Sequence, residues 1–246
     1  MKRLRLDLLL VQRGFAESRE KAQRLVLAGE VLVDDAPAAK PGHEYSVDCD
    51  LRVRRPERFV GRGGLKLEEA FVRFPDLRAE GKVCADIGAS TGGFTDCLLQ
   101  HGAAKVYAID VGRAQLHPRL AADPRVVVRD GCNARHLQAD DLPERLDLAV
   151  ADVSFISLRL ILPALDRLLR PGGEAVVLVK PQFEAGREEV GKGGVVRDPA
   201  LRQRIVDRIR EFGEQSLSWR WLGFCQSPIQ GPAGNVEFLS YWRKNP

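Results

Sequence analysis

The stretch "VCADIGASTGGF", residues 83–94, is an apolar run that reaches a carboxylate and then bends through glycines. The run predicts a buried strand, and the glycines predict a backbone that approaches a ligand closely. The bend is no dinucleotide loop, because Ser90 stands two residues after Gly88, and it lacks the Gly-Lys-Ser/Thr ending of a P-loop. With no lysine in the bend and with Asp86 just before it, we expect a ligand that carries positive charge.

The composition places the 246-residue chain among globular proteins, with 44% hydrophobic and 29% charged residues. No apolar run approaches the roughly 18 residues of a membrane-spanning helix, so we expect no membrane partner. The cysteines form no C-x-x-C pair, and free thiols indicate a cytoplasmic location. The five cysteines are scattered and the four histidines do not cluster, so we expect no metal site. The length suits one large and one small domain, and we expect a monomer.

Positive charge is concentrated near the start of the chain. Residues 1–24 carry seven basic against three acidic side chains, and residues 52–66 carry six basic side chains against Glu57. Most charge runs are only solvated surface, but two basic runs that flank one small segment favour a polyanion partner. The candidate RNA-binding residues are Arg3, Arg5, Arg19, Lys21, Arg24, Arg54, Arg55 and Arg62.

The first part of the chain predicts a small α+β domain. Helices are expected over 4–14 and 18–30, with Ser18 as N-cap and Gly14 and Gly29 as ends, and strands over 31–35 and 50–56. The stretch "LDLLLVQRGFAESREKAQRLVLAGEVLVDDAPAAKPG" resembles the RNA-binding domain first seen in small-subunit ribosomal protein S-four. Asp34-Asp35 stand where that domain commonly has Asn-Gly. The resemblance implies that the basic helical face grips structured RNA.

From residue 64 onward the pattern alternates between strands and helices. Strands are expected over 83–88, 105–111, 125–130, 146–154, 174–181, 218–228 and 235–243, and helices over 65–74, 93–102, 114–121, 158–170 and 198–215. This order predicts an α/β fold with a mostly parallel, Rossmann-like sheet and helices on both faces. We expect the small domain with its basic linker over 1–60 and the sheet domain over 61–246.

Four of the expected strands carry a carboxylate near their ends: Asp86, Asp110, Asp130 and Asp152. Asp110 lies 24 residues after Asp86, which is the place of the acid that binds the ribose hydroxyls in a nucleoside-binding unit. Asp130 could reach an adenine amino group. Any one of these acids could instead be a cap or an edge residue. Four beside a glycine bend favour S-adenosylmethionine, whose ammonium and sulfonium are cationic.

The strand over 174–181 brings Lys180 to the same edge, where it should pair with Asp152. The pair could be purely structural. Alternatively, a desolvated lysine beside a cationic sulfonium releases its proton more readily, which would make it usable as a base.

The motifs "DIGASTGGFTDCLL", "AIDVG", "ADVSFISL", "LVKPQFE", "GGVVRDP" and "GNVEF" resemble the TlyA-type branch of the FtsJ-like ribosomal RNA 2′-O-methyltransferases, once labelled hemolysins. The resemblance implies methyl transfer from S-adenosylmethionine to a ribose 2′ oxygen. It assigns the catalytic tetrad to Lys66, Asp152, Lys180 and Glu237, with Lys180 as base. It also implies that the cofactor is bound by Asp86, Gly88, Ser90, Gly92, Gly93, Phe94, Asp110, Val111, Asp130 and Asn133. Gly61 stands where relatives often have Ser.

The substrate expected from this resemblance is a cytidine ribose in ribosomal RNA, on the ribosomal subunit. Large-subunit RNA is favoured because relatives that modify both subunits extend further at the C-terminus than "SYWRKNP". Three alternatives remain open: an RNA-binding assembly factor that binds S-adenosylmethionine without catalysis, a methyltransferase for protein or small molecules, and a hemolysin. The RNA module argues against the second alternative, and the absence of a spanning segment argues against the third.

Overall fold

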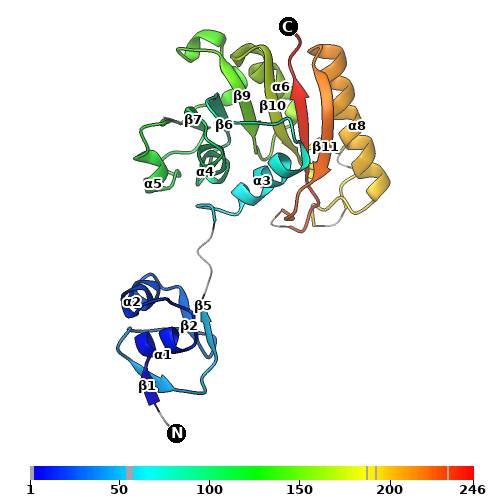
Figure 1. Ribbon diagram of the computed structural model, residues 1–246. Helices are drawn as coiled ribbons and strands as arrows, with labels where there is room; N and C mark the ends of the chain where they lie inside the picture. The colour runs from blue at the N-terminus through cyan, green and yellow to red at the C-terminus, as the bar shows by residue number, and fades with distance from the viewer. Residues whose placement is uncertain (1–2, 54–57, 187, 192, 232) are drawn as a thin grey trace. The chain divides into compact units, whose positions relative to one another are not determined.

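The computed structural model describes residues 3–53, 58–186, 188–191, 193–231 and 233–246. The chain divides into two compact units, Met1–Arg58 and Phe59–Pro246 (Figure 1). The two units have separate hydrophobic cores, one in the small unit and two in the large unit, on opposite faces of its sheet.

The small unit packs two helices against short strands. Its elements are β1 (Arg3–Arg5), α1 (Leu6–Gln12), α2 (Arg19–Leu27), β2 (Val31–Val33), β3 (Ala36–Pro37), β4 (Glu44–Ser46) and β5 (Leu51–Val53). Leucines of α1 at i, i+3 and i+4 spacing are fully buried against α2 and β2, as the sequence pattern predicts. The predicted N-cap is confirmed, because Ser18 accepts a hydrogen bond from the Lys21 amide at 3.2 Å.

The turn at Asp34-Asp35 keeps the hairpin geometry although glycine is absent. Both residues have left-handed φ angles, +49° and +63°, and they join Val33 to its partner Ala36. A two-residue hairpin needs this conformation, which is strained for aspartate. The side chains offset part of the strain, because Asp34 accepts from the Asp50 amide at 2.9 Å.

The large unit is a seven-stranded sheet between helices (Figure 1). Its elements are α3 (Gly63–Arg73), β6 (Val83–Ile87), α4 (Gly93–Gln100), β7 (Lys105–Asp110), α5 (Pro118–Ala121), β8 (Val126–Asp130), η1 (Ala134–His136), η2 (Ala139–Asp141), β9 (Leu146–Ala151), α6 (Leu158–Leu168), β10 (Leu169–Val179), α7 (Pro181–Glu184), α8 (Pro199–Ser216), β11 (Arg220–Gln226) and β12 (Phe238–Arg243). The strand order is β11-β12-β10-β9-β6-β7-β8, and the predicted α/β fold is confirmed.

The five strands from β10 to β8 are parallel, and β12 and β11 complete the edge in antiparallel pairing. Alternate strand residues face two cores. One core joins the sheet to α6 and α8, and the other joins it to α3 and α4. The inner parallel strands β6, β7, β9 and β10 are therefore buried on both faces, which explains their nearly continuous apolar sequences, whereas the edge strand β8 is largely exposed.

The helices α1, α2, α4, α5 and α6 are shorter than the predicted ranges, and α5 and α6 show how the neighbouring backbone limits a helix. The helix expected over 114–121 is only α5, which begins at Pro118, because Ala114 has a left-handed φ of +52° that no α-helix accepts. The helix expected over 158–170 ends at Leu168, and β10 begins directly after it with an irregular register before Glu174. The very short β1, β3 and β4 were not predicted, because two or three residues carry no readable alternation.

The start of α4 packs directly on backbone. A Cβ added at Gly93 would lie 2.7 Å from the Gly64 nitrogen and 3.1 Å from the Gly63 Cα. Backbone atoms cannot move aside as a flexible side chain does. We therefore expect Gly93→Ala to lower the free energy of unfolding by about 1–3 kcal/mol, measured by urea denaturation. The control is Gly186→Ala, where the nearest atom is 3.6 Å away; equal stability of both variants would contradict this packing.

Candidate active site

Four charged side chains from distant parts of the sequence form one network. The Asp152 Oδ1 lies 2.6 Å from the Lys180 Nζ, and its Oδ2 lies 3.1 Å from the Lys66 Nζ. The Lys66 Nζ also donates to the Glu237 Oε2 at 2.8 Å. The expected pairing of Lys180 with Asp152 is therefore confirmed, and Lys66 and Glu237 join the same network.

The sheet topology explains why these residues meet. Asp152 follows β9 and Lys180 follows β10, and these strands are parallel neighbours, so both residues leave the sheet at the same edge. Glu237 directly precedes β12, which is antiparallel to β10, so its entry lies at that edge too. Lys66 comes from α3, which packs on this face near β12.

The two lysines have different surroundings. Burial lowers the pKa of Lys66, but the carboxylates of Asp152 and Glu237 outweigh burial and raise it overall. Lys66 is therefore held as a charged ammonium between two acids. Among the residues that the structure describes, Lys180 contacts one carboxylate, that of Asp152, and donates to the neutral Ser154 Oγ at 2.8 Å, whereas Lys66 contacts two carboxylates.

The network lines a cavity of about 290 Å³, and a second cavity of about 470 Å³ adjoins it. Gly88, Ser90, Asp152 and Ser154 line both cavities, so the two form one continuous site. Volumes of this order suit a bound small molecule. Gly88 sits where the halves meet, with φ +80°, and a Cβ there would lie 2.5 Å from the Asp152 carbonyl oxygen. Only glycine fits this position.

Most of the predicted cofactor residues line this site. Asp86, Gly88, Ser90, Gly93 and Phe94 line the first cavity, and Gly88, Ser90, Asp110, Val111 and Asn133 line the second. Gly92 and Asp130 line neither. The space beside Gly92 is filled by Leu116 and Leu120. The exposed Asp130 accepts a hydrogen bond from the Ala114 amide at 2.8 Å. This bond ties the loop after β7 to the end of β8.

Asp110 is fixed at the mouth of the second cavity by two backbone amides. Its Oδ2 accepts from the Ser90 amide at 2.8 Å and its Oδ1 from the Gly112 amide at 2.7 Å. These contacts tie the glycine bend to the end of β7. The carboxylate is thus already oriented, and its remaining lone pairs are those that ribose hydroxyls need.

Asp86 is fully buried below the glycine bend. Its Oδ2 accepts from the amide and hydroxyl of Thr95 at 2.8 and 2.7 Å. Its Oδ1 has no hydrogen-bond partner among the described residues. Burial raises the pKa of Asp86 to about 7, although the Thr95 contacts oppose this. A cation delivered to the cavity would supply the missing partner.

The structure adds residues that the sequence pattern did not single out. Ser154 contacts Lys180, and Phe155 is 90% exposed beside the second cavity with a left-handed φ of +62°. Strain of this kind in a bulky residue is typical of functional sites. The Phe155 ring lies 5.0 Å from that of Phe183, just past Lys180. The sequence around Phe155 gives no sign of its left-handed φ angle, because no glycine or asparagine stands at this position.

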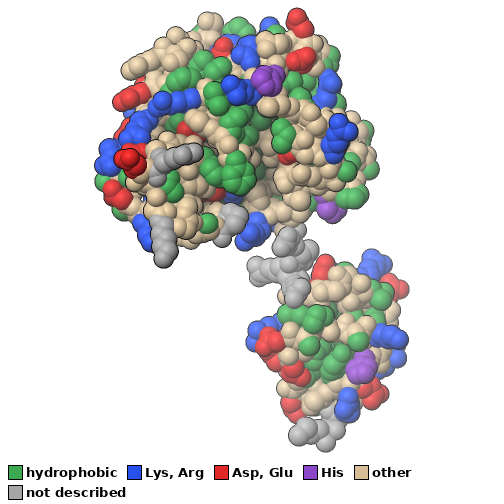
Figure 2. All heavy atoms as spheres, turned by 180° about the vertical axis from the view of Figure 1, so that it is seen from behind, with side chains coloured by type: hydrophobic (Ala, Val, Ile, Leu, Met, Phe, Trp, Pro, Cys, Tyr) green, Lys and Arg blue, Asp and Glu red, His purple; other side chains and the backbone are tan. Residues whose placement is uncertain are grey.

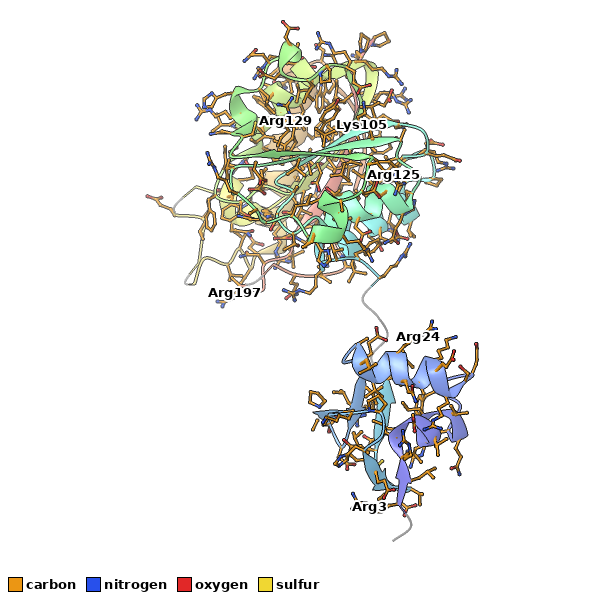
Figure 3. All side chains as sticks on the ribbon, turned by 90° about the vertical axis from the view of Figure 1, so that its left-hand side faces the viewer. Arg3, Arg24, Lys105, Arg125, Arg129 and Arg197 are labelled. Carbon is orange, nitrogen blue, oxygen red and sulfur yellow. The ribbon has the colours of Figure 1, made fainter. Side chains whose placement is uncertain are left out.

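The predicted RNA-binding residues do not form one group. Arg5 and Arg19 meet at Asp7, whereas Arg3 and Arg24 lie at opposite ends of the small unit (Figure 3). Lys21 pairs with Glu17 at 3.0 Å. Arg62 lines the first cavity. Arg54 and Arg55 lie outside the described residues.

The surface of the small unit mixes charges. On the face drawn in Figure 2, basic, acidic and apolar side chains alternate over it, with no continuous positive area. The total charge of the basic runs therefore does not by itself define where RNA would bind.

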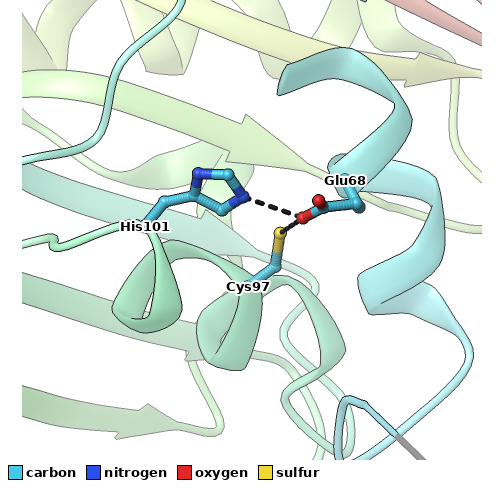
Figure 4. Close-up of side chains that lie close together, drawn as sticks. All are labelled: Glu68, Cys97 and His101. Atoms are coloured by element: carbon cyan, nitrogen blue, oxygen red, sulfur yellow. Dashed lines mark hydrogen bonds and ion pairs between the residues drawn. The ribbon is translucent and has the colours of Figure 1, made fainter. Parts of the chain in front are cut away.

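Glu68, Cys97 and His101 join α3 to α4 (Figure 4). The His101 Nε2 lies 2.8 Å from the Glu68 Oε2, and the Cys97 Sγ lies 3.8 Å from the same oxygen. Two ligands of one tetrahedral zinc are about 3.3 Å apart, because each bond is about 2.0 Å long. The shorter contact is that of a hydrogen bond or ion pair, and His101 also stacks on Phe71 at 3.9 Å.

Residues 59–244 match the FtsJ-like methyltransferase family, and residues 4–48 match the S4 domain. The chain is 47% identical over 244 residues to the 16S/23S rRNA (cytidine-2′-O)-methyltransferase TlyA of Mycobacterium tuberculosis, covering 98% of this chain and 90% of that protein. It is 35% identical to the 23S rRNA (cytidine-2′-O)-methyltransferase TlyA of Campylobacter jejuni, covering 77% and 72%. A solved candidate hemolysin from Streptococcus thermophilus is 43% identical, with a TM-score of 0.76 over 100% of this chain and 90% of that one.

The chain therefore belongs to the FtsJ-like methyltransferase family and carries an S4 domain before the methyltransferase domain. Its methyl donor is S-adenosylmethionine. The site fits this donor, because the buried Asp86 Oδ1 and the oriented Asp110 offer carboxylate acceptors beside a bare glycine backbone. Among the described residues, no helix is long and apolar enough to cross a membrane.

The raised pKa of Asp86 gives the unliganded protein a pH-dependent stability. The folded-state pKa of about 7 lies above the ordinary value of 3.8, so between these values the folded protein keeps a proton that the unfolded chain releases. Stability from this group is therefore lost as pH rises from about 4 to 7, by up to about 4 kcal/mol. We expect the difference in free energy of unfolding between Asp86→Asn and wild type, measured by urea denaturation, to favour the variant more at pH 7.5 than at pH 5. A difference that is the same at both pH values would contradict the raised pKa.

Proposed function

We propose that this protein transfers a methyl group from S-adenosylmethionine to the ribose 2′ oxygen of a cytidine in ribosomal RNA, with large-subunit RNA as the main target. The observation that carries the proposal is the network in which Asp152 holds Lys180 and Lys66 at the edge of the cofactor cavity. Support for the substrate comes from the S4 domain and from two relatives whose names both specify cytidine-2′-O and 23S rRNA.

The proposed general base is Lys180. A ribose hydroxyl is a poor nucleophile, so a group must take its proton as the methyl bond forms. The Lys180 Nζ lies in the cavity wall, and its hydrogen bonds to Asp152 and Ser154 fix its position. Lys66 is less suited to this step, because the acids around it raise its pKa and keep it protonated. Its charge instead holds Asp152 and Glu237 in place.

The cofactor-binding roles follow from the two cavities. S-adenosylmethionine supplies an electrophilic methyl group when bound. Asp110 would accept from its ribose hydroxyls, Asp86 would face its cationic end, and Gly88 gives room between them. Val111 and Asn133 would line the adenosine side. Holding donor and acceptor in line lowers the barrier by several kcal/mol without further chemistry.

The division of labour that we propose places RNA capture in the domain over 1–60 and methyl transfer in the domain over 61–246. Arg3, Arg5, Arg19, Lys21 and Arg24 of the first domain, Arg54 and Arg55 of its basic linker, and Arg62 at the start of the second domain would contact RNA phosphates. The enzyme would act as a monomer in the cytoplasm, where ribosomal subunits are found. No observation favours hemolysis as a second function.

The proposal is tested by mapping 2′-O-methyl groups on both ribosomal RNAs from cells with and without the gene. We expect one cytidine of large-subunit RNA to lose its methyl group in the deletion strain. Purified protein should restore it on subunits from that strain when S-adenosylmethionine is added. Restoration of ribosome assembly without methyl transfer would instead support a non-catalytic assembly factor.

Changes at Lys180 test the base. We expect Lys180→Ala to lower turnover by roughly 10²–10⁴-fold while S-adenosylmethionine affinity changes little, because the base acts on the acceptor. Lys180→Arg should be almost as inactive, since a guanidinium does not deprotonate in proteins. Single-turnover methylation and calorimetry measure the two effects. Substantial turnover by the arginine variant would rule out the base role.

A fragment over 59–246 tests the division of labour. It retains the whole sheet and Lys66, so we expect it to fold and to bind S-adenosylmethionine as the full chain does. Its methylation of large subunits should fall strongly, because it lacks the S4 domain. Equal methylation by the fragment and the full chain would remove the S4 domain from RNA recruitment.

A further inference from the structure

A buried carboxylate, that of Asp7, lies in the core of the small unit. Asp7 stands in the first turn of α1 and is completely buried, although its domain is rich in exposed arginine. Buried acids of this kind are retained only when they are paired and hydrogen-bonded. The hydrogen-bond partners of Asp7 therefore indicate its role.

Among the described residues, the partners of the Asp7 carboxylate are N–H donors from the neighbouring β1 and from α2. Arg5 donates from Nε to Oδ1 at 3.1 Å and from Nη2 to Oδ2 at 2.9 Å. Arg19 and Gln23 on α2 each donate to Oδ2 at 2.9 Å. The Arg5 contacts hold the pKa of Asp7 well below its usual range, against the effect of burial, and Gln23 and Arg19 add to this. Asp7 is therefore ionised under all ordinary conditions.

The two arginines keep an outward edge. Arg5 is 41% exposed and Arg19 is 52% exposed. Among the described residues, the Nη1 of Arg5 and both Nη atoms of Arg19 have no hydrogen-bond partner. One carboxylate thus holds the inner edges of two guanidinium groups and leaves their outer N–H groups facing solvent. Guanidinium groups fixed in this way match the oxygens of a phosphodiester.

The 41–43 loop passes close beside Arg5. Gly42 lies so close that a Cβ there would be 3.1 Å from Nη2 and 3.2 Å from Nη1 of Arg5. The loop is itself anchored, because the Asp7 amide donates to the Pro41 carbonyl at 3.0 Å and the Leu6 amide to the His43 carbonyl at 2.9 Å. Arg5 is therefore placed both by the carboxylate and by a glycine that leaves room for it.

We propose that Asp7 is a positioning residue for RNA, which orients Arg5 and Arg19 as a two-arginine seat for a phosphate of folded ribosomal RNA. The proposal rests on the proposed function. Elsewhere in the unit, Arg3 and Arg24 lie apart and Lys21 is paired with Glu17. The pair at Asp7 is thus the place where two of the candidate RNA-binding side chains are held together by a common partner.

Asp7→Asn separates positioning from charge. The change removes a negative charge beside two arginines, so charge alone would strengthen binding to RNA. Positioning predicts the opposite, because the amide nitrogen of Asn repels a donor and the guanidinium groups lose their fixed orientation. We expect full-length Asp7→Asn to bind unmodified large ribosomal subunits roughly tenfold more weakly, with a salt slope smaller by up to about 2 because two phosphate contacts are lost.

Kinetics separate this role from a general structural one. We expect KM for the subunit to rise while kcat at saturating subunit and the affinity for S-adenosylmethionine stay near wild type. In a background of Arg5→Ala with Arg19→Ala, Asp7→Asn should have no further effect on subunit affinity, because Asp7 acts through these side chains. Glu17→Gln is the matched control; it also removes an acid beside a basic residue, and it should leave affinity equal or slightly higher.

Gly42→Ala keeps the test decisive if Asp7→Asn disrupts the small unit, which circular dichroism of the full chain would reveal. The alanine leaves Asp7 charged, and its Cβ would shift the Arg5 guanidinium by a few tenths of an ångström, so we expect a modest weakening of subunit binding with an intact fold. Binding of folded Asp7→Asn or Gly42→Ala as tight as wild type would overturn the proposal. A wild-type protein that binds subunits but transfers no methyl group would overturn the proposed function instead, and the two failures are therefore distinguishable.

Discussion

The Asp152 carboxylate between the amino groups of Lys66 and Lys180 is the constraint on which the methyltransferase domain depends. Its two oxygens contact Lys66 and Lys180, so the charges of the lysines are tolerated at a largely buried site. Without the carboxylate, Lys180 would lose this acid contact and Lys66 would be left with Glu237. These contacts form only where α3 and the ends of β9 and β10 come together, and Glu237 joins the start of β12 to the same network. The antiparallel β12 is thus part of the active site as well as of the sheet edge.

Much of this arrangement could be predicted from the sequence, because parallel strands deliver their carboxyl ends to one edge. The apolar runs before Asp152 and Lys180 sufficed to predict their meeting. Spacing could not show what fills the space beside a glycine. Gly92 looks like part of a ligand loop, yet Leu116 and Leu120 occupy that space, and its left-handed φ of +98° serves the entry into α4. Tertiary packing decided this position, and local sequence carries no record of it.

The small domain shows a similar limit in the prediction of charge. Counting basic residues in 1–24 predicts a polyanion partner, and the S4 match agrees with this. In this count of charges, Asp7 only lowers the net positive charge of residues 1–24. In the structure, Asp7 is the residue that gives Arg5 and Arg19 a common orientation. Net charge measures attraction at long range, whereas recognition depends on which donors are held still.

Asp7 and Asp86 show how one chemical group serves two purposes according to its partners. Both are fully buried aspartates. Arginine contacts lower the pKa of Asp7, so it stays ionised. Its charge is paired inside the protein with Arg5 and Arg19 and holds these side chains in place. Within the described part of the chain, Asp86 has only the neutral Thr95 as hydrogen-bond donor, and burial raises its pKa to about 7. Its cost in stability is recovered only when a cation enters the cavity. A donor with positive charge is therefore favoured over a neutral nucleoside of the same shape, because only the charged donor relieves the buried carboxylate.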